Sequence, residues 1–473
     1  MELHEHTALE LHQALQRREV SPVELAAHYL ERIERLNPQV GAFVTVTPEA
    51  ALVRAAYVER EVPTARPLWG MPVADKDLLR REGVPSRFGS RAFTDFIPDD
   101  SDELVRDIDA AGAVSLGKSA TPEFGLPSYT EGLAGPPTRN PWDLALGAGG
   151  SSGGAAAAVA AGMLPFAPGS DGGGSIRIPA ASCGLVGVKP SRGRVPAGSG
   201  LGGLAGLGVA GPIARTVADA ALLLDGLVAP LGYPAAHRHA VRAPGDDGPF
   251  LAAAIRGEGR FQLGVMTDSP WDEAYEIEID PEATIALDRA VAEFEAIGHG
   301  VERMTPSPEP GYAPAFRTIW QSGAATIPVD GDDEALLEPL TRWLLERGRR
   351  VPARELAEAL AWLAGYEERV IHRFSSFDAV LTPALALTPR PVGWYDPDDG
   401  ERNFAQQVQF TPFTSFVNVS GLPAITVPVT ETSEGVPMGV QLIGRPGGET
   451  ELFALAAQLE RRVRRAGRRP PVW

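Results

Sequence analysis

Two serines in one stretch of this chain stand behind glycine runs, and a serine can act as a nucleophile once a base removes its proton. Ser151 follows Gly149-Gly150, and Ser175 follows Gly172-Gly173-Gly174. Because glycine lacks a Cβ, successive backbone N–H groups of such a run can approach a ligand atom closely. An oxyanion binds well to N–H groups arranged in this way. A helix-length, alanine-rich segment separates the two runs, so the stretch predicts a nucleophile beside an oxyanion hole rather than a flexible linker.

Lysine is rare in this chain, and its positions are informative. Of the 43 basic residues, only Lys76, Lys118 and Lys189 are lysine. A buried lysine can lose its proton and act as a base, whereas a guanidinium stays protonated in proteins. Lys76 follows the apolar run 68–74, which we expect to be a buried strand, and strand ends often carry site residues in α/β proteins. We predict Lys76 as the candidate base, with a surface lysine between two aspartates as the alternative, and Lys118 and Lys189 as structural residues.

Two further patterns match known motifs but stand in the wrong context. Residues 112–119 match the P-loop pattern, yet a P-loop needs a strand before its first glycine and a helix after its lysine. An expected helix precedes this glycine, so we exclude nucleotide binding here. Ser152 is central in a nucleophile-elbow pattern, which needs a preceding apolar strand and a histidine partner. Residues 29–236 contain no histidine, which leaves distant residues such as His299 and His372 for that alternative.

Composition argues against several classes of function. The formal net charge of −18 over 473 residues disfavours nucleic acid or an anionic membrane as a partner. No window of about 18 uninterrupted apolar residues occurs, and the first residues lack the basic-then-apolar pattern of a secretion signal. The single cysteine, Cys183, can form neither an intramolecular disulfide nor a cysteine-based metal site. We expect a soluble, cytoplasmic protein that acts on a small molecule, and we leave a homodimer open as its assembly.

Strands and helices alternate along the chain, which predicts an α/β fold with helices on both faces of a sheet. Thr7 and Ser21 are expected to begin the first two helices with capping boxes. Expected helices cover 7–18, 21–35, 48–61, 101–111, 154–163, 217–227, 281–297 and 448–466, and much of 305–365. Expected strands cover 68–74, 113–116, 261–266, 377–381, 424–429 and 436–443, with another from Val301 onward. Residues 228–260 are expected to form an exposed connection, and no internal repeat or domain boundary is evident.

Many short motifs occur together and in order. They include Gly149-Gly150-Ser151-Ser152-Gly153-Gly154, then Asp171 with Gly173-Gly174-Ser175-Ile176-Arg177, and the upstream pair Lys76-Asp77. Further matches are Asn140-Pro141-Trp142, Gly187-Val188-Lys189-Pro190, Gly211-Pro212-Ile213-Ala214-Arg215-Thr216 and Gly439-Val440-Gln441-Leu442-Ile443-Gly444. On these residues the chain resembles the amidase signature family of serine amidohydrolases. The similarity covers essentially the whole chain and is weakest across 228–410.

The resemblance implies a fold, a domain organisation and a catalytic site. The fold would be the amidase-signature α/β fold, a large mixed β-sheet covered by helices on both faces. Residues 1–473 would form a single amidase domain, with a signature core at about 66–220 and a more variable substrate-pocket region at about 228–410. The triad would consist of Ser175 as nucleophile, Ser151 as bridging serine on a cis peptide bond, and Lys76 as base. The oxyanion hole would use the backbone N–H groups of Gly172, Gly173, Gly174 and Ser175, held in place by Ser152, Asp171 and Arg177.

The activity that the resemblance implies is hydrolysis of the C–N bond of a small aryl or aliphatic carboxamide through an acyl-enzyme on Ser175. No metal or cofactor is required, and esters, anilides and carbamates would react by the same chemistry. The residues at 129–132 and 170–174 are similar to the branch of nylon-oligomer cyclic-dimer hydrolases and aryl acylamidases. Two alternatives stay open: a glutamine-amidase type subunit of a transamidation complex, and an inactive scaffold of the same fold. Residues 207–210 lack the Ser-Leu-Asp-Gln run usual in that subunit, which favours a stand-alone hydrolase.

Asp75, directly before Lys76, departs from the apolar residue usual in the family. Unless Asp75 points to solvent, its charge would favour the ammonium form of Lys76 and oppose the role of base.

Three aromatic residues are candidate walls of the substrate pocket: Trp320, Phe124 and Phe413. Packing in the core explains each of these residues equally well.

Overall fold

A mixed β-sheet forms the centre of the molecule. The computed structural model describes residues 2–195, 203–228, 249–465 and 467–473. Within these residues the main sheet has eight strands, in the order β10-β9-β11-β13-β12-β7-β8-β6. These strands are β6 (Phe166–Asp171), β7 (Val186–Lys189), β8 (Val209–Ala214), β9 (Gln262–Val265), β10 (Gly300–Arg303), β11 (Ala379–Pro383), β12 (Ala424–Glu431) and β13 (Pro437–Gly444). Strand β9 pairs in parallel with β10 and β11, and the other neighbours pair antiparallel, so the expected mixed sheet is confirmed.

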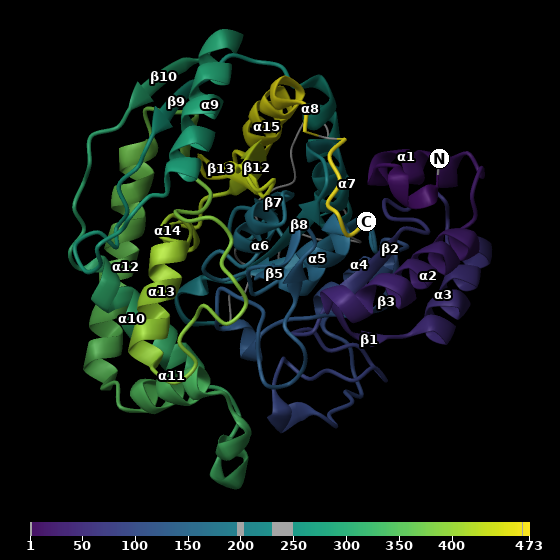
Figure 1. Cartoon of the computed structure of the whole chain (residues 1–473), viewed down its shortest axis with the longest axis horizontal. Coiled ribbons are helices and arrows are strands. Elements are labelled where there is room, and N and C mark those ends of the chain that lie inside the picture. The colour runs from purple at the N-terminus through teal and green to yellow at the C-terminus, as the bar shows by residue number, and fades with distance from the viewer. Residues whose placement is uncertain (1, 196–202, 229–248, 466) are drawn as a thin grey trace.

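Helices surround this sheet. They are α1 (Ala8–Gln16), α2 (Pro22–Val40), α3 (Pro48–Glu61), α4 (Glu103–Ala110), α5 (Gly153–Ala160), α6 (Arg177–Ser182), α7 (Val217–Val228), α8 (Phe250–Arg256), α9 (Pro281–Ile297), α10 (Tyr312–Ala324), α11 (Pro339–Arg349), α12 (Ala353–Phe374), α13 (Gly400–Phe410), α14 (Ser415–Val419) and α15 (Glu449–Val463). Figure 1 shows α10 to α13 together on the left of the molecule and the N-terminal helices α1 to α3 on the right.

Both faces of the main sheet are covered, because side chains alternate along a strand between the two faces. In β11, Ala379 and Leu381 belong to the core that also contains residues of α9 and α15. Val380, between them, belongs instead to the core formed with α10, α12 and α14. The expectation of helices on both faces is therefore confirmed.

A smaller sheet carries the candidate base. It consists of β1 (Phe43–Val46), β3 (Val114–Ser119) and β2 (Pro72–Lys76), with β2 and β3 parallel. Lys76 is the last residue of β2, which is buried along its whole length. The stretch that matches a P-loop runs into β3, so Lys118 belongs to a buried strand rather than to a phosphate-binding loop.

Local signals explain where the first two long helices begin. The Thr7 hydroxyl accepts a hydrogen bond from the Glu10 N–H over 3.1 Å, and the Ser21 hydroxyl accepts one from the Glu24 N–H over 3.1 Å. Both predicted capping boxes are confirmed. Helix α2 continues beyond its expected end and stops at Gly41, whose φ of 68° is a left-handed conformation that favours glycine.

Several elements are not apparent from the sequence pattern. Strand β6 reads Phe-Ala-Pro-Gly-Ser-Asp, which has neither a period of two nor a run of β-branched residues. Strands β7 and β8 and helices α13 and α14 also lie where the pattern predicts no regular element. Helix α8 falls within the expected connection at 228–260, and residues 229–248 of that connection lie outside the described residues. These elements are stabilised by pairing and packing with distant parts of the chain, which local pattern does not report.

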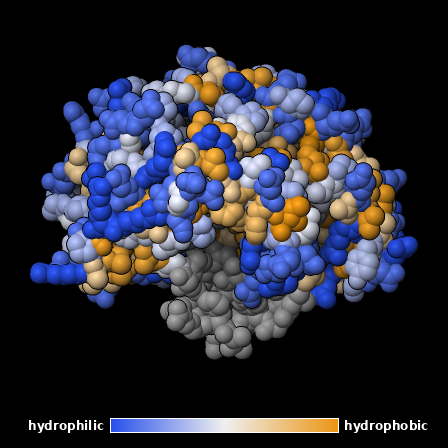
Figure 2. Space-filling model, turned by 90° about the horizontal axis from the view of Figure 1, so that it is seen from below, coloured by the Kyte–Doolittle hydropathy of each residue, from blue (hydrophilic) through white to orange (hydrophobic). Residues whose placement is uncertain are grey.

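One face of the molecule has an ordinary mixture of hydrophilic and hydrophobic residues (Figure 2). Among the residues that the structure describes, no helix is both long and apolar enough to cross a lipid bilayer. Figure 2 shows one face of the molecule, on which hydrophilic residues predominate and hydrophobic residues are scattered among them. Such scattered hydrophobic side chains are normal on a protein surface.

Gly154 in α5 occupies a position where the packing admits no side chain. A Cβ at residue 154 would lie 2.2 Å from the Ala120 N atom and 2.5 Å from the Ala42 carbonyl oxygen. We expect Gly154→Ala to lower the free energy of unfolding by about 1–3 kcal/mol, because backbone atoms must shift to admit the methyl group. Chemical denaturation followed by circular dichroism measures this change. Gly135→Ala is the matched control, since a Cβ there meets no atom within 4 Å, and an equal loss in both variants would contradict the packing explanation.

Candidate active site

Lys76, Ser151 and Ser175 come from three separate parts of the chain. Lys76 ends β2, Ser151 lies shortly before α5, and Ser175 follows β6. Lys76 Nζ donates a hydrogen bond to Ser151 Oγ over 2.8 Å, although the two residues are 75 positions apart. The peptide bond between Gly150 and Ser151 is cis. The structure therefore brings the predicted base and the predicted bridging serine into direct contact.

Burial changes the chemistry of Lys76. Its side chain is 1% exposed, and its Nζ also donates to Ser170 Oγ over 3.0 Å, a contact that the sequence analysis does not assign. Loss of hydration lowers the pKa of Lys76 to about 7, and the negative charge of Asp171 opposes this shift without cancelling it. Near pH 7 a large fraction of the amine is therefore neutral and has a lone pair that can accept a proton.

Asp75 does not point to solvent, but it has its own cation. The side chain is completely buried, accepts hydrogen bonds from Arg81 Nε over 2.6 Å and from the Ser115 hydroxyl over 2.9 Å, and forms an ion pair with Arg81. Adjacent residues of a strand project to opposite faces, so Asp75 and Lys76 face different surroundings. From the sequence we expect the charge of Asp75 to favour the ammonium form of Lys76. This expectation is corrected, because the positive charge of Arg81 compensates the carboxylate.

The Asp171 carboxylate organises the glycine loop before Ser175. It is completely buried and accepts hydrogen bonds from the backbone N–H groups of Gly174 over 2.7 Å and Ile176 over 3.1 Å. Arg177 donates to both carboxylate oxygens, over 3.0 Å each. Burial alone would raise the pKa of Asp171, but the charge and hydrogen bonds of Arg177 hold it well below its ordinary value. Asp171 is therefore ionised and fixes the shape of the loop.

This geometry corrects one predicted role in the oxyanion hole. The N–H of Gly174 donates to Asp171, so it already has an acceptor and is not free to bind an oxyanion. Gly174 has a φ of 133°, and a Cβ there would lie 2.5 Å from Thr414 Oγ1, so this residue serves the close approach of Thr414 instead. The other expected N–H donors keep that role as predictions.

Arg177 ties the loop to distant elements. It is completely buried and donates to Gln441 Oε1 over 2.7 Å and to Asn418 Oδ1 over 2.6 Å. Asn418 Nδ2 in turn donates to the Asp171 carboxylate over 2.8 Å. Asp171 and Arg177 are predicted from the sequence to support the site, whereas Asn418 and Gln441 are not. A polar amide inside the apolar runs Phe-Val-Asn-Val and Val-Gln-Leu-Ile is the signal that points to such buried partners.

Ser152 also supports the loop. Its N–H donates to the Ser175 carbonyl oxygen over 3.1 Å, and its hydroxyl donates to the Ser170 carbonyl oxygen over 3.2 Å. The side chain is completely buried. The alternative of a nucleophile elbow finds no support, because both ring nitrogens of His299 are bonded to other partners and His372 is exposed in α12.

The other two lysines are completely buried as well. Lys118 Nζ lies 2.9 Å from Asp77 Oδ1 and donates to the Ser86 hydroxyl over 2.9 Å, an acidic partner that the sequence analysis does not foresee. Lys189 Nζ donates to the Pro190 carbonyl oxygen over 3.1 Å, and burial lowers the pKa of this amine to about 7. Both amines therefore bond to groups of the protein itself, which agrees with the predicted structural roles of Lys118 and Lys189.

Ser175 borders an open pocket of about 490 Å³, its mouth included. The lining residues are Leu126, Pro127, Ser128, Gly173, Ser175, Ile178, Trp271, Phe316, Trp320, Phe404, Gln407, Val408, Thr411 and Ser415. None of these described residues carries a charged side chain. Trp320 belongs to the wall, as predicted. Phe124 and Phe413 do not line it: Phe413 is completely buried and Phe124 packs on Phe93, so core packing explains both.

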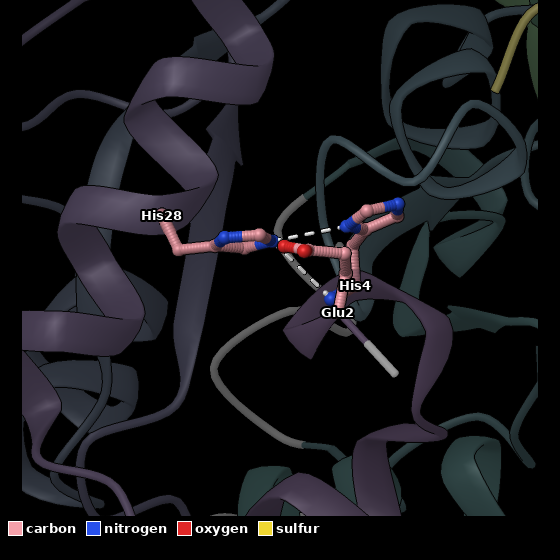
Figure 3. Close-up of side chains that lie close together, drawn as sticks. All are labelled: Glu2, His4 and His28. Atoms are coloured by element: carbon pink, nitrogen blue, oxygen red, sulfur yellow. Dashed lines mark hydrogen bonds between the residues drawn. The ribbon is translucent and has the colours of Figure 1, made fainter.

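One group among the described residues could hold a metal ion. Glu2, His4 and His28 place their ligand atoms within 4.8 Å of one another. Figure 3 shows the two imidazoles facing each other with Glu2 beside them, and His4 Nδ1 lies 3.1 Å from His28 Nε2. Burial and then the charge of Arg32 lower the pKa of both imidazoles, and the same charge disfavours a cation nearby. None of the three residues lines the pocket of Ser175, and the absence of a metal stays a prediction.

Comparisons with known proteins find similarity over nearly the whole chain. Residues 24–453 match the family model described as Amidase. AmiB2 of Mycobacterium tuberculosis, a protein named as an amidase, is 38% identical over 450 residues, which cover 94% of this chain and 93% of that protein. A subunit of glutamyl-tRNA(Gln) amidotransferase from a Geobacter species is 34% identical over 491 residues, which cover 98% of each. Two solved structures are also similar over nearly their full length. The structure of 6-aminohexanoate cyclic dimer hydrolase complexed with substrate has a TM-score of 0.89 and 29% sequence identity, and the match covers 99% of both chains. The structure of a bacterial aryl acylamidase has a TM-score of 0.83 and 27% sequence identity, and the match covers 96% of both chains.

Replacement of Asp171 tests whether its charge holds the site together. We expect Asp171→Asn to lower the free energy of unfolding by about 3–5 kcal/mol at pH 7, because Arg177 then loses its buried partner. The folded pKa of Asp171 is depressed, so its stabilisation is complete above the unfolded value of about 4 and is lost as the pH falls below it. Chemical denaturation at pH 7 and at about pH 2, which lies inside the range where the stabilisation is lost, measures both effects.

Asp95→Asn is the matched control, because Asp95 is exposed and a surface change of this kind alters stability by about 0.5 kcal/mol or less. Equal stability of the Asp171→Asn and Asp95→Asn variants would show that the buried carboxylate does not hold the loop.

Proposed function

This chain belongs to the amidase family, which confirms the resemblance seen in its sequence, and we propose that it hydrolyses the C–N bond of a small carboxamide through an acyl-enzyme on Ser175. The observation that carries the proposal is the hydrogen bond of 2.8 Å between Lys76 Nζ and Ser151 Oγ, next to a pocket that Ser175 lines. Membership of the amidase family supports hydrolysis of C–N bonds in general. We propose the roles of Lys76, Ser151 and Ser175 and the class of substrate in addition.

In the first half-reaction Ser175 attacks the carbonyl carbon of the amide. Ser151 accepts the proton of the Ser175 hydroxyl as it passes its own proton to the neutral amine of Lys76, since a hydroxyl can donate and accept at once. The negative charge that develops on the carbonyl oxygen is bound by the N–H groups of Gly172, Gly173 and Ser175. Loss of one such donor typically slows an enzyme by about 10²–10³-fold.

The first half-reaction ends with loss of the amine, and the second half-reaction releases the acyl group. The C–N bond breaks as the leaving nitrogen takes a proton back from the Lys76–Ser151 pair, and the amine departs. In the second half-reaction water attacks the ester formed on Ser175 and gives one proton to the same pair. The pair passes this proton to Ser175 Oγ as the acyl–oxygen bond breaks, which leaves a carboxylic acid and the free serine. Esters, anilides and carbamates present the same carbonyl carbon and would follow the same steps.

The pocket favours a stand-alone hydrolase over the subunit of a transamidation complex. The relative from Geobacter carries the name of such a subunit, so this alternative has a specific basis. Glutamine presents an ammonium and a carboxylate that need charged partners, and the described lining residues offer none. The alternative of an inactive scaffold is disfavoured because Lys76, Ser151 and Ser175 are all present. A cytoplasmic location, a homodimer, the absence of a cofactor and the division into core and variable regions stay predictions.

Active-site labelling tests the nucleophile and the base. We expect a fluorophosphonate to label Ser175, as located by peptide mass mapping, and we expect no label at that peptide in Ser175→Ala. Lys76→Ala should slow labelling by about 10²–10⁴-fold, because the proton of the serine then has no base to accept it. Ser433→Ala, which removes an exposed hydroxyl, should label at the wild-type rate. A label on Ser152, or undiminished labelling of Lys76→Ala, would exclude the proposed triad.

The pH dependence of labelling tests the protonation state of Lys76. Its pKa is lowered to about 7, and only the neutral amine accepts a proton. The rate should therefore fall about tenfold per pH unit below pH 6, rise through pH 7 and level off above pH 8. In Lys76→Ala this step should disappear. A step that persists in Lys76→Ala would assign the titration to another group, such as the buried amine of Lys189.

A further inference from the structure

Two aromatic residues of the pocket beside Ser175, Phe316 and Trp320, belong to a row of aromatic side chains on one helix. Tyr312, Phe316 and Trp320 stand at intervals of four residues in α10, so they lie on one face of the helix. The ring centroids of Phe316 and Trp320 are 5.5 Å apart with 17° between the planes, and those of Tyr312 and Phe316 are 5.8 Å apart with 21°. The three side chains therefore form a stack of nearly parallel rings, and Trp320 is its last member.

Trp320 lies against the loop that is proposed to bind the oxyanion. A Cβ built on Gly172 would lie 3.8 Å from Cη2 and Cζ3 of the Trp320 indole, and one on Gly173 would lie 3.8 Å from Cη2. Because neither glycine has a side chain, the indole is the first group beside this part of the backbone. The ring of Trp320 therefore borders both the glycine loop and the pocket that Ser175 lines.

Three of the polar side chains that line the pocket have hydrogen-bond partners within the protein. Gln407 Oε1 accepts a hydrogen bond from the Ser128 N–H over 2.8 Å. Thr411 Oγ1 donates to the Gln407 carbonyl oxygen over 2.9 Å, and Ser415 Oγ accepts from Trp271 Nε1 over 3.1 Å. With no charge among the described lining residues, the pocket offers an occupant mainly apolar and aromatic surface.

We propose that the substrates are amides of aromatic carboxylic acids, whose ring stacks on Trp320, and that Trp320 determines this specificity. The inference rests on the proposed acyl-enzyme at Ser175. The acyl group stays bound through both half-reactions, whereas the amine leaves after the first, so a pocket that holds the acyl group can lower both barriers. A flat ring attached to the carbonyl gains offset-stacked contact with the indole, which a puckered or linear chain of similar size does not gain.

The test compares two acyl groups of equal ring size. Benzamide carries a flat ring and cyclohexanecarboxamide a puckered one, and kcat/KM is measured for both with wild type, Trp320→Leu and Trp362→Leu. The ratio of the two values is compared between variants, because the intrinsic reactivity of each amide then cancels. We expect Trp320→Leu to lower the ratio on the order of tenfold, in line with the loss of one aromatic pair. Trp362 packs on Tyr366 in α12 outside the pocket, so Trp362→Leu should leave the ratio unchanged.

Fluorophosphonate labelling of Ser175 in the same samples separates the possible failures. With Ser175 labelled, an unchanged ratio in Trp320→Leu or an equal loss in Trp362→Leu overturns the inference but not the proposed hydrolysis. Turnover of acetanilide without turnover of benzamide also overturns it, because the aromatic ring would then belong to the amine side. Absence of labelling in folded wild type overturns the proposed function, and this inference with it.

Discussion

The arrangement of the site depends on the buried ion pair between Asp171 and Arg177. Two charges removed from water persist only where hydrogen bonds and opposite charge replace their hydration. Asp171 uses its oxygens to hold backbone N–H groups of the glycine loop, and Arg177 reaches Asn418 and Gln441, which are 241 and 264 positions away in the chain. The loop next to Ser175 therefore takes its shape from the assembled sheet and its helices, because glycine by itself would leave the loop free to adopt many conformations.

Lys76 and Asp75 show how neighbouring residues of one strand meet opposite requirements. The carboxylate of Asp75 is buried with a cation, Arg81, which keeps it compensated. The amine of Lys76 is buried against serine oxygens, which accept hydrogen bonds but carry no charge. Desolvation then lowers the pKa of Lys76 to about 7, against the weaker attraction of Asp171. A two-residue period is enough to separate these environments, because successive side chains of a strand leave it on opposite faces.

The sequence alone supports the class of fold, the family and the boundaries of helices such as α3 and α9, but it does not reveal contacts that depend on tertiary structure. Thr7 and Ser21 are predictable as caps because a cap involves residues only three positions away. Strand β6 is not predictable from its pattern, because most of its residues have low strand propensity and its hydrogen bonds to β8 stabilise the strand instead. The hydrogen bond from the Gly174 N–H to the Asp171 carboxylate is not predictable either, because it depends on the direction of the Asp171 side chain in the folded protein. Asn418 and Gln441 escape notice because their partner is more than 240 positions away.

The burial of all three lysines has a consequence for the outside of the molecule. Lys76, Lys118 and Lys189 are each at most 1% exposed, so every basic side chain of this chain that reaches solvent is an arginine or a histidine. Succinimidyl esters, lysine acetyltransferases and amine-directed cross-linkers therefore find no lysine on the folded surface. The same reagents would reach these amines as the fold opens, which makes primary-amine acylation a sensitive reporter of local unfolding at the centre of the protein.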